Sequence, residues 1–333
     1  MDDLANGMGA GDRTAIDLAN GVRAGDRTAI GRAITLVEST RPDDRRLAQE
    51  LLAGLLPNAG GAHRIGVSGV PGAGKSTLID ALGTRLTGAG HRVGVLAVDP
   101  SSMVTGGSIL GDKTRMAALA ADERAFIRPS PSAGMLGGVT STTPHAITVL
   151  EAAGYDVVLV ETMGVGQAEA AVHASVDCLC VLALAGAGDE LQAVKRGLLE
   201  LADVLVVNKA DGGNEQAARL AAAEFRRALP LLAPTGEGGP PPVMTVSAAT
   251  GAGVDELWDC IAEHRRALDT SGGLVRRRAR GRLAWMRVLL ERRLVEQFEA
   301  RPGAAERRAA LEQAVEQGQL TPESAVDQLL SQL

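Results

Sequence analysis

The segment GVPGAGKST at residues 69–77 constrains the fold of this chain more than any other stretch of its sequence. It matches the pattern G-x-x-x-x-G-K-[ST], with the apolar segment RIGVS before it and the helix-forming segment TLIDALGTRL after it, as that pattern requires. Glycines let the backbone wrap a phosphate group with its N–H groups pointing inward, and the dipole of the following helix adds to the attraction. The alternative is a chance glycine-rich turn, which would leave both flanks unexplained.

This segment therefore predicts a nucleotide-binding loop. We expect Lys75 to reach the outer phosphates and Ser76 to offer its hydroxyl to Mg²⁺. The residues predicted to surround the phosphates are Gly69, Gly72, Ala73, Gly74, Lys75, Ser76 and Thr77.

Apolar runs alternate with helical patterns through the middle of the chain. The apolar runs are 64–68, 92–98, 156–161, 177–184 and 203–208, and VMTVS at 243–247 is a last one. The helical patterns are 76–88, 113–121, 142–153, 189–201, 214–229 and 254–268. Apolar runs between helices are typical of buried parallel strands. The fold class predicted for residues 61–270 is therefore α/β, a doubly wound domain with a mostly parallel sheet.

Helical patterns also flank this domain. Residues 28–60 are predicted to form a helical N-terminal extension, and residues 271–333 a helical C-terminal arm that packs on the core or on a second copy. Residues 1–27 precede these patterns as a leader. The segment LANGMGAGDRTAI (4–16) recurs at 18–30 as LANGVRAGDRTAI. Because this leader is short and glycine-rich, we expect it to be poorly ordered and assign it no function.

The tetrapeptide NKAD at residues 208–211 predicts recognition of a guanine base. The carboxylate of Asp211 can accept hydrogen bonds from the N1–H and the exocyclic amine of guanine, whereas adenine presents an acceptor at N1. Lys209 can lie along the base plane, and backbone N–H groups in the run VSAAT can reach the guanine oxygen. A simple Asp-Gly turn after a strand is the alternative. The predicted base-binding residues are Asn208, Lys209, Asp211, Ser247 and Ala248.

The segment VLVETMGVGQ at residues 158–167 places a carboxylate at the end of an apolar run. Glu161 is predicted to act on Mg²⁺ through a water molecule or on the attacking water, and Gly164 to present its N–H to the γ-phosphate. Gln167 then belongs to a loop that moves when the phosphate leaves. The alternative for Glu161 is a capping role at a helix start.

Two further carboxylates are expected near the phosphates. Asp99 ends the run HRVGVLAV, and Asp112 lies in GGSILGDKTRM. Either can bind Mg²⁺ directly or through water, or polarise the attacking water, and a capping role remains the alternative for both. The predicted catalytic residues are Lys75, Asp112, Glu161 and Gly164, and the predicted metal-binding residues are Ser76, Asp99, Asp112 and Glu161.

Composition excludes several classes of function. The net charge of −6 argues against general nucleic-acid binding, and an aromatic content of 2% argues against stacking platforms for bases. The three cysteines predict no disulfide framework, and Cys178 and Cys180 are expected to be buried core residues. The five histidines are scattered, so no His/Cys cluster suggests a metal cargo. No apolar run approaches the roughly 18 residues of a spanning helix, and we expect a cytoplasmic protein without membrane or nucleic-acid partners.

Taken together, the motifs resemble those of the MeaB/ArgK-type GTPases, which are methylmalonyl-CoA mutase-associated chaperones of the SIMIBI class of P-loop proteins. The resemblance begins at about Thr28 and runs to the C-terminus. It is carried, in this order, by GVPGAGKST, VDPSS, GGSILGDKTRM, IRPSP, LGGVT, ETMGVGQAE, GDELQAVKRG and NKADG. The residues of the segment ASVDCLCVLALAGAG differ from those usual in the family, so the resemblance makes no prediction for the loop before Asp189.

The resemblance implies a homodimeric GTPase whose helical C-terminal arm serves dimerisation. It implies binding of an adenosylcobalamin-dependent acyl-CoA mutase, gating of cofactor delivery from the cobalamin adenosyltransferase, and protection of the mutase, with GTP hydrolysis as the timer. It also implies that Lys195 belongs to a mobile loop that responds to the partner, although the residues alone indicate a solvated helix lysine. Gln167 and Lys195 are the predicted partner-responsive residues.

Two other functions could use the same loop. A metabolic kinase would need a substrate pocket and a phosphoacceptor, and the guanine motif argues against it. A GTPase that inserts a metal such as nickel would need a His-rich or Cys-x-x-Cys relay, which the sequence lacks. The predicted function is therefore a GTP-hydrolysing chaperone, with methylmalonyl-CoA mutase as the favoured client.

Overall fold

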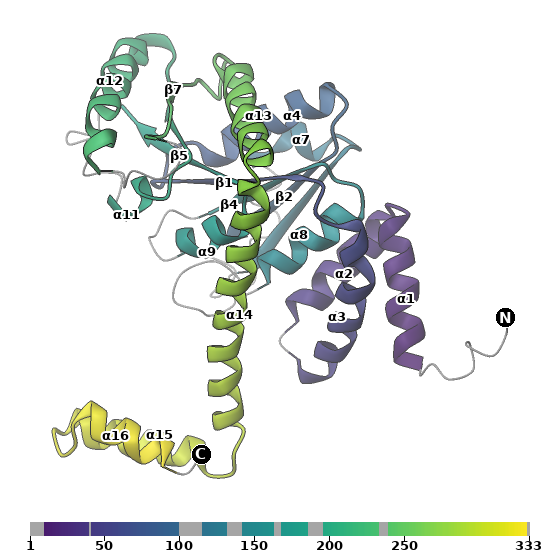
Figure 1. Cartoon of the computed structure of the whole chain (residues 1–333), viewed down its shortest axis with the longest axis vertical. Coiled ribbons are helices and arrows are strands. Elements are labelled where there is room, and N and C mark those ends of the chain that lie inside the picture. Colours follow the sequence, from purple (N-terminus) through teal and green to yellow (C-terminus); the bar gives the residue numbers. More distant parts are fainter. Residues whose placement is uncertain are drawn as a thin grey trace. The chain divides into compact units, whose positions relative to one another are not determined.

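A computed structural model describes residues 10–39, 41–99, 115–131, 142–162, 168–185, 196–232 and 239–331. Their centre is a seven-stranded sheet in the order β3-β2-β4-β1-β5-β6-β7, in which every neighbouring pair is parallel (Figure 1). The strands are β1 (His63–Gly69), β2 (Val93–Asp99), β3 (Ala125–Pro131), β4 (Val157–Glu161), β5 (Cys178–Leu184), β6 (Val204–Asn208) and β7 (Val243–Thr245). The predicted doubly wound α/β class is confirmed.

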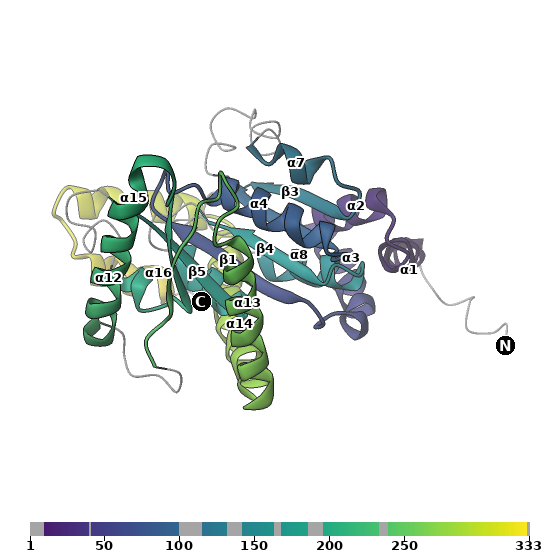
Figure 2. The same cartoon turned by 90° about the horizontal axis from the view of Figure 1, so that it is seen from above.

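Helices cover both faces of the sheet. One face packs against α4 (Lys75–Gly88), α7 (Ala117–Ala120) and α13 (Val254–Thr270), and the other against α8 (Thr143–Ala152), α9 (Ala168–Ser175), α11 (Arg196–Leu199) and α12 (Glu215–Leu232). The helix α12 contacts β7, and in Figure 2 it lies on the other side of β1 and β5 from β3. Residues along each strand alternate between the two cores, so Val158 and Val160 join one and Val157 and Leu159 the other. Both faces are covered, which explains why the strands read as continuous apolar runs.

The central strand β1 determines where a ligand can bind. It pairs with β4 on one side and β5 on the other, although the chain visits β2 and β3 in between. The order of strands therefore reverses around β1, and such a reversal opens a crevice at the carboxyl ends of parallel strands. The loop after β1, the end of β4 and the end of β6 all meet at this carboxyl edge.

The strand β3 was missed by the sequence analysis, which left residues 125–131 unassigned. Its segment AFIRPSP contains Pro129 and Pro131, and proline normally argues against a strand because it cannot donate to the ladder. Here β3 is an edge strand that pairs only with β2, so prolines are tolerated. Of the helix expected at 113–121, residues 113 and 114 lie outside the described residues, and α7 spans Ala117–Ala120.

The N-terminal segment is more ordered than expected. The helices are α1 (Ala10–Arg23), α2 (Arg27–Glu38) and α3 (Pro42–Leu55), whereas a poorly ordered leader was expected over 1–27. Ala15, Ala19 and Val22 recur on one face of α1 and are buried. Because these side chains are small, α1 can approach α3 closely, and a Cβ placed on Gly54 would lie 3.8 Å from the Cβ of Ala19.

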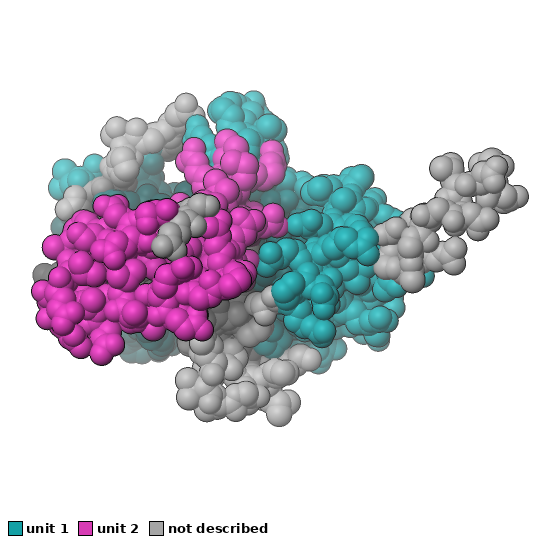
Figure 3. Space-filling model, turned by 90° about the horizontal axis from the view of Figure 1, so that it is seen from below, with its two compact units in different colours: residues 1–280 teal, residues 281–333 magenta. Residues whose placement is uncertain are grey.

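The C-terminal helices are α14 (Gly273–Glu299), α15 (Ala304–Glu316) and α16 (Pro322–Leu330). The chain divides into two compact units, residues 1–280 and residues 281–333 (Figure 3). The division falls inside α14 rather than at residue 271, because the first turns of α14 are bonded to the sheet domain. In the part of the chain that the structure describes, no helix is long and apolar enough to cross a membrane.

Candidate nucleotide site at the carboxyl edge of the sheet

The loop between β1 and α4 has the backbone that its glycines predict. Gly69, Gly72 and Gly74 have φ values of 141°, 78° and 86°, a region that side-chain-bearing residues rarely adopt. Space excludes a side chain as well, because a Cβ on Gly69 would lie 2.3 Å from the carbonyl oxygen of Leu182. The glycines thus shape the loop at the start of α4, and the N–H groups of a helix's first turn, which have no acceptor within the helix, favour an anion there.

Lys75 lies within this loop and is largely buried. Its ammonium group donates hydrogen bonds to the carbonyl oxygens of Gly69 and Val70, at 2.9 and 3.2 Å. A phosphate in the loop would compete for the same ammonium group, because a charged acceptor binds more strongly than a neutral carbonyl. Lys75 therefore lies in the loop between β1 and α4, and its role at the outer phosphates stays a prediction.

Ser76 and Glu161 meet beside the loop. The Ser76 hydroxyl donates to a Glu161 carboxylate oxygen at 2.8 Å, and the register that pairs Val67 with Glu161 brings the end of β4 to this position. Hydroxyl and carboxylate oxygens are hard ligands of the kind that Mg²⁺ takes. The pair thus fits a magnesium site.

Asp99 is the last residue of β2, two residues after Ala97, which pairs with Glu161. Its backbone therefore lies at the same edge as the Ser76–Glu161 pair. Four other predicted site residues lie outside the described residues: Asp112, Gly164, Gln167 and Lys195.

The base-recognition segment is braced against the phosphate loop. Asn208 donates from Nδ2 to the carbonyl oxygen of Ala73 at 2.7 Å and accepts from the backbone N–H of Ala248 at 3.2 Å. Its side chain thus connects the phosphate loop with the VSAAT segment, a role that motif spacing alone does not reveal. Asp211 accepts a hydrogen bond from the Ser247 hydroxyl.

Lys209 adopts a left-handed backbone with φ of 59°, which is rare for a residue with a side chain. Its carbonyl oxygen accepts from the Asn214 side chain at 2.8 Å, and the N–H of Ala210 donates to Val246 at 3.1 Å. These bonds hold a sharp turn at the end of β6, and backbone strain of this kind is concentrated at functional sites.

The opposite, amino edge of the sheet holds a network of buried ion pairs that the sequence analysis did not anticipate. Arg278 binds both oxygens of Asp177, at 2.8 and 2.7 Å, and Arg265 binds the same carboxylate at 3.0 Å. Arg277 binds both oxygens of Asp203, at 2.8 and 2.6 Å. These bonds fasten the first turns of α14 to the sheet domain.

The charges of this network are stabilised by their partners. Burial alone would raise the pKa of Asp177, but hydrogen bonds and charge from Arg278 outweigh it and hold that pKa below its ordinary value. Burial likewise opposes the charge of Arg277, and Asp203 outweighs it, so the pKa of Arg277 is raised. Asp177 and Arg277 therefore carry their charges at neutral pH.

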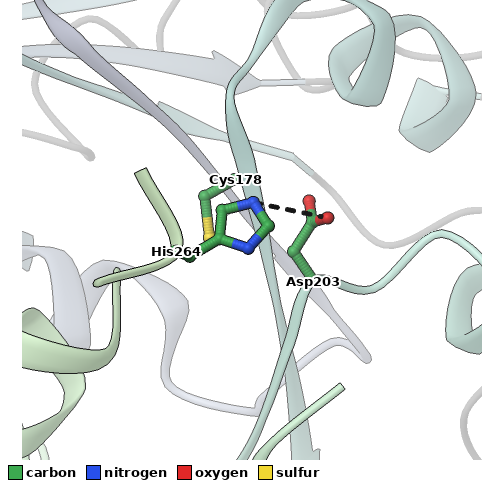
Figure 4. A group of neighbouring side chains, drawn as sticks. All are labelled: Cys178, Asp203 and His264. Atoms are coloured by element: carbon green, nitrogen blue, oxygen red, sulfur yellow. Dashed lines mark ion pairs between the residues drawn. The ribbon is translucent and has the colours of Figure 1, made fainter. Parts of the chain in front are cut away.

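The same edge brings Cys178, Asp203 and His264 together, with one potential ligand atom from each lying within 4.8 Å of the others (Figure 4). Sequence spacing could not reveal this group, because its members come from three separate elements. The Asp203 carboxylate is already bound by Arg277 and by the backbone N–H of Leu179 at 2.8 Å. A hydrogen bond with Cys180, followed by burial, raises the pKa of the Cys178 thiol well above its ordinary value. The positive guanidinium and the neutral thiol both disfavour a cation here.

Comparison with known proteins places this geometry in a family. Residues 30–303, which include every described residue of the nucleotide site, match the model of the family described as methylmalonyl-CoA mutase-associated GTPase MeaB. A protein of Mycobacterium tuberculosis named as a probable GTPase is 53% identical over 330 residues, covering 99% of this chain and 94% of that protein.

Two further relatives extend the comparison. A mouse protein named methylmalonic aciduria type A homolog, mitochondrial, is 46% identical over 308 residues, which cover 90% of this chain and 74% of that protein. A solved structure named LAO/AO transport system kinase has a TM-score of 0.75 and 36% identity, and the match covers 95% of this chain and 96% of that one.

Proposed function

The chain belongs to the family of MeaB-type methylmalonyl-CoA mutase-associated GTPases, and from this premise we propose that it binds guanine nucleotides, hydrolyses GTP to GDP and phosphate with Mg²⁺, and assists an adenosylcobalamin-dependent acyl-CoA mutase. The proposed assistance is cofactor loading and protection of the mutase. The observation that carries the nucleotide part is the side chain of Asn208, which connects the phosphate loop to the base-recognition segment.

Preference for guanine is assigned to Asp211. Its carboxylate lies at the turn after β6 and accepts a hydrogen bond from Ser247. Asp211 is two residues after Lys209, whose backbone is strained. A carboxylate there can accept two hydrogen bonds from guanine but meets an acceptor on adenine, and a buried polar group without a partner costs about 1–3 kcal/mol. The backbone N–H of Ala248 bonds Asn208, so it contributes by fixing the segment around the base.

The phosphate end is assigned to Lys75, Ser76 and Glu161. Ser76 would supply its hydroxyl to Mg²⁺, with Asp99 and Asp112 as further carboxylates near it, and the ion would supply positive charge against the charge that develops during transfer. Glu161, once its contact with Ser76 is exchanged, would face the magnesium site and act on the ion through a water molecule or accept a hydrogen bond from the attacking water. Gly164 is proposed to donate its N–H to the γ-phosphate.

The mutase partner is proposed from the family description and from the name of the mouse relative, which refers to methylmalonic aciduria. Methylmalonyl-CoA mutase is the favoured client, and the cobalamin adenosyltransferase is proposed as a second partner in cofactor delivery. Gln167 and Lys195 are proposed to respond to the partner.

The C-terminal unit, residues 281–333, supports a homodimer. Along α14, Leu283, Met286, Leu290 and Leu294 recur at intervals of three and four residues, so they share one helix face. Their side chains are between 53% and 56% exposed. A stripe of this kind is typical of a helix that packs against another helix, and we propose a second copy as the partner. Replacing Leu290 and Leu294 with Glu should then lower the mass measured by light scattering to that of a monomer.

The proposal is tested by GTP turnover of the purified protein, alone and with methylmalonyl-CoA mutase of the same organism. We expect slow intrinsic turnover of GTP, much slower turnover of ATP, and clear acceleration by the mutase. Equal turnover of ATP and GTP would contradict guanine recognition. Intrinsic GTP turnover that the mutase does not change would contradict the choice of client and direct the search to another cobalamin-dependent mutase.

A further inference from the structure

Two buried hydroxyl groups link β1 to the end of β4. The Thr162 hydroxyl donates to the Ser68 hydroxyl at 2.8 Å, and the two residues are 1% and 0% exposed. The backbone N–H of Thr162 also donates to the carbonyl oxygen of Val67 at 3.0 Å. Thr162 directly follows Glu161, and Ser68 directly precedes the first glycine of the phosphate loop. The pair thus connects the start of the phosphate loop with the end of β4, the two segments assigned to the phosphates.

This link lies on the opposite face of the sheet from the Ser76–Glu161 contact. Side chains alternate along β4, so Leu159 and Glu161 face α4, whereas Val160 and Thr162 face the core on the other side. The end of β4 is therefore held from both faces, by Ser76 on one and by Ser68 on the other.

Stability alone gives little reason for two hydroxyl groups at this position. Replacing both partners of a buried hydrogen bond with apolar groups of the same shape can be nearly neutral, whereas the bond between them requires a defined direction. A hydrogen-bonded pair restricts the relative position of two strands more than an apolar contact does. Because this pair lies beside Glu161, we infer that it restricts the position of Glu161.

We propose that Ser68 and Thr162 are positioning residues that keep Glu161 directed at the magnesium site when the Ser76 hydroxyl turns from Glu161 to the ion. This inference rests on the proposed function. While Ser76 and Glu161 are bonded to each other, the end of β4 is held both by that bond and by the Thr162–Ser68 bond. Once Ser76 is exchanged, the end of β4 loses the Ser76 contact and keeps the Thr162–Ser68 bond. The pair therefore matters most in the Mg²⁺-bound state.

The test measures how much Mg²⁺ tightens nucleotide binding. Affinity for GDP carrying a fluorescent ribose label is determined in EDTA and in saturating Mg²⁺, and the ratio is the Mg²⁺ gain. Thr162→Val keeps the side-chain shape and removes the hydroxyl. We expect the affinity in EDTA to stay within about twofold of wild type and the Mg²⁺ gain to fall roughly tenfold, the effect of one well-placed hydrogen bond. Thr162→Ser should restore the gain.

Thr87→Val is the matched control. Thr87 is also buried in the domain, and its hydroxyl donates to the carbonyl oxygen of Thr84 at 3.0 Å. It lies eleven residues after Ser76 in α4, about 16 Å along the helix axis. Thr87→Val should therefore leave the Mg²⁺ gain unchanged, even where it lowers the unfolding temperature.

Ser68→Ala provides a second variant should Thr162→Val fold poorly, and it should reduce the Mg²⁺ gain by a similar factor. The double variant should lose no more than either single variant, because both remove the same bond. An unchanged Mg²⁺ gain in both single variants overturns the positioning role while nucleotide binding, and with it the proposed function, stands. Equal losses in EDTA and in Mg²⁺, or the same loss in Thr87→Val, would also overturn it. A wild-type chain that binds no guanine nucleotide would overturn both proposals.

Discussion

Ser76 at the carboxyl edge of the sheet and Asp177 at the amino edge both hold hydrogen bonds, but of different kinds. The Ser76 hydroxyl donates to Glu161, and Lys75 beside it bonds the neutral carbonyls of its own loop. Asp177 accepts from two guanidinium groups and a backbone N–H, and its side chain is 3% exposed. Contacts at the carboxyl edge can be exchanged for a ligand, whereas those of Asp177 at the amino edge pair buried charges with one another.

This difference separates function from stability within one sheet. A hydrogen bond with one charged partner contributes about 1.5–3 kcal/mol, and a phosphate or a cation offers a comparable charge-assisted contact in its place. Breaking a buried ion pair costs about 3–5 kcal/mol because it leaves an uncompensated charge. Substitutions at the carboxyl edge should therefore lower activity with little change in folding, and substitutions at the amino edge should do the reverse.

The largest effect is expected from Lys75→Ala. Removing the ammonium group takes a positive charge away from the phosphates, and the GTP turnover number should fall at least a hundredfold, roughly the loss seen when one preorganised donor is removed. The unfolding temperature should change much less than the turnover number, because Lys75 donates to neutral carbonyl oxygens of its own loop rather than to a buried charge. Turnover equal to wild type would remove Lys75 from the site.

Asp177→Asn should have the largest effect on folding. It leaves the buried guanidinium groups of Arg278 and Arg265 facing a neutral amide, so the free energy of unfolding in urea should fall by about 3 kcal/mol or more. GTP turnover measured well below the unfolding temperature should stay within about twofold of wild type. A loss of turnover without a loss of stability would break the division between the two edges.

The lowered pKa of Asp177 predicts how the stability of the folded chain depends on pH. Because Arg278 lowers the pKa of Asp177 in the folded state, the unfolded chain binds the proton more readily. The stability that Asp177 contributes is thus complete above its ordinary pKa of about 4 and is lost as pH falls through the lowered folded value. Urea unfolding of wild type should weaken more steeply than that of Asp177→Asn as pH falls below about 5. Parallel curves would contradict this assignment.

Asp211→Asn should change the choice of base. The amide cannot accept from both guanine donors, so affinity for GDP should fall roughly 10- to 100-fold, the range for a hydrogen bond to a charged group. Affinity for xanthosine diphosphate should rise, because its base presents an oxygen that the amide can bind. Calorimetric titration of both nucleotides measures the switch, and unchanged preference for GDP would exclude Asp211 from base reading.

Asp255→Asn should have the smallest effect. Asp255 pairs with Arg85 on the surface, and the two side chains are 54% and 55% exposed. Exposed pairs contribute about 0–1 kcal/mol, so neither stability nor turnover should change measurably. A loss as large as that of Asp177→Asn would show that burial does not decide which ion pairs matter in this chain.

The carboxyl edge was predictable from sequence because its chemistry is local. Lys75 and Ser76 belong to one nine-residue motif, and Asn208 and Asp211 to one tetrapeptide, so spacing alone defined them. What the sequence could not reveal is how these segments are connected, such as the Asn208 contact with Ala73, 135 residues away. The predicted partner-responsive residues remain predictions.

The amino edge was not predictable because its partners are distant in sequence. Arg277 and Asp203 lie 74 residues apart, and Arg278 and Asp177 lie 101 apart, so each residue read alone is an ordinary surface charge. The arginine-rich start of α14 therefore gave no prediction of an ion-pair network. Only the fold places its first turns against the sheet.

The duplicated segment shows the same limit at short range. In the second copy, Asp26 precedes α2 and its carboxylate accepts from the N–H of Thr28, as a helix-capping residue does. In the first copy, the same letters GDRTAI fall inside α1. Local sequence is identical in the two places, so packing of each helix on its surroundings decides where it begins.

The most direct test of the account is amide hydrogen exchange of the full chain with and without GDP and Mg²⁺. The account predicts that nucleotide slows exchange at 69–77, 160–162, 207–211 and 246–249, while 63–65, 177–179 and 276–279 keep the protection they already have. Slowed exchange confined to the amino edge, or no change at the carboxyl edge under conditions where GDP binds, would contradict the claim that the exchangeable contacts form the nucleotide site.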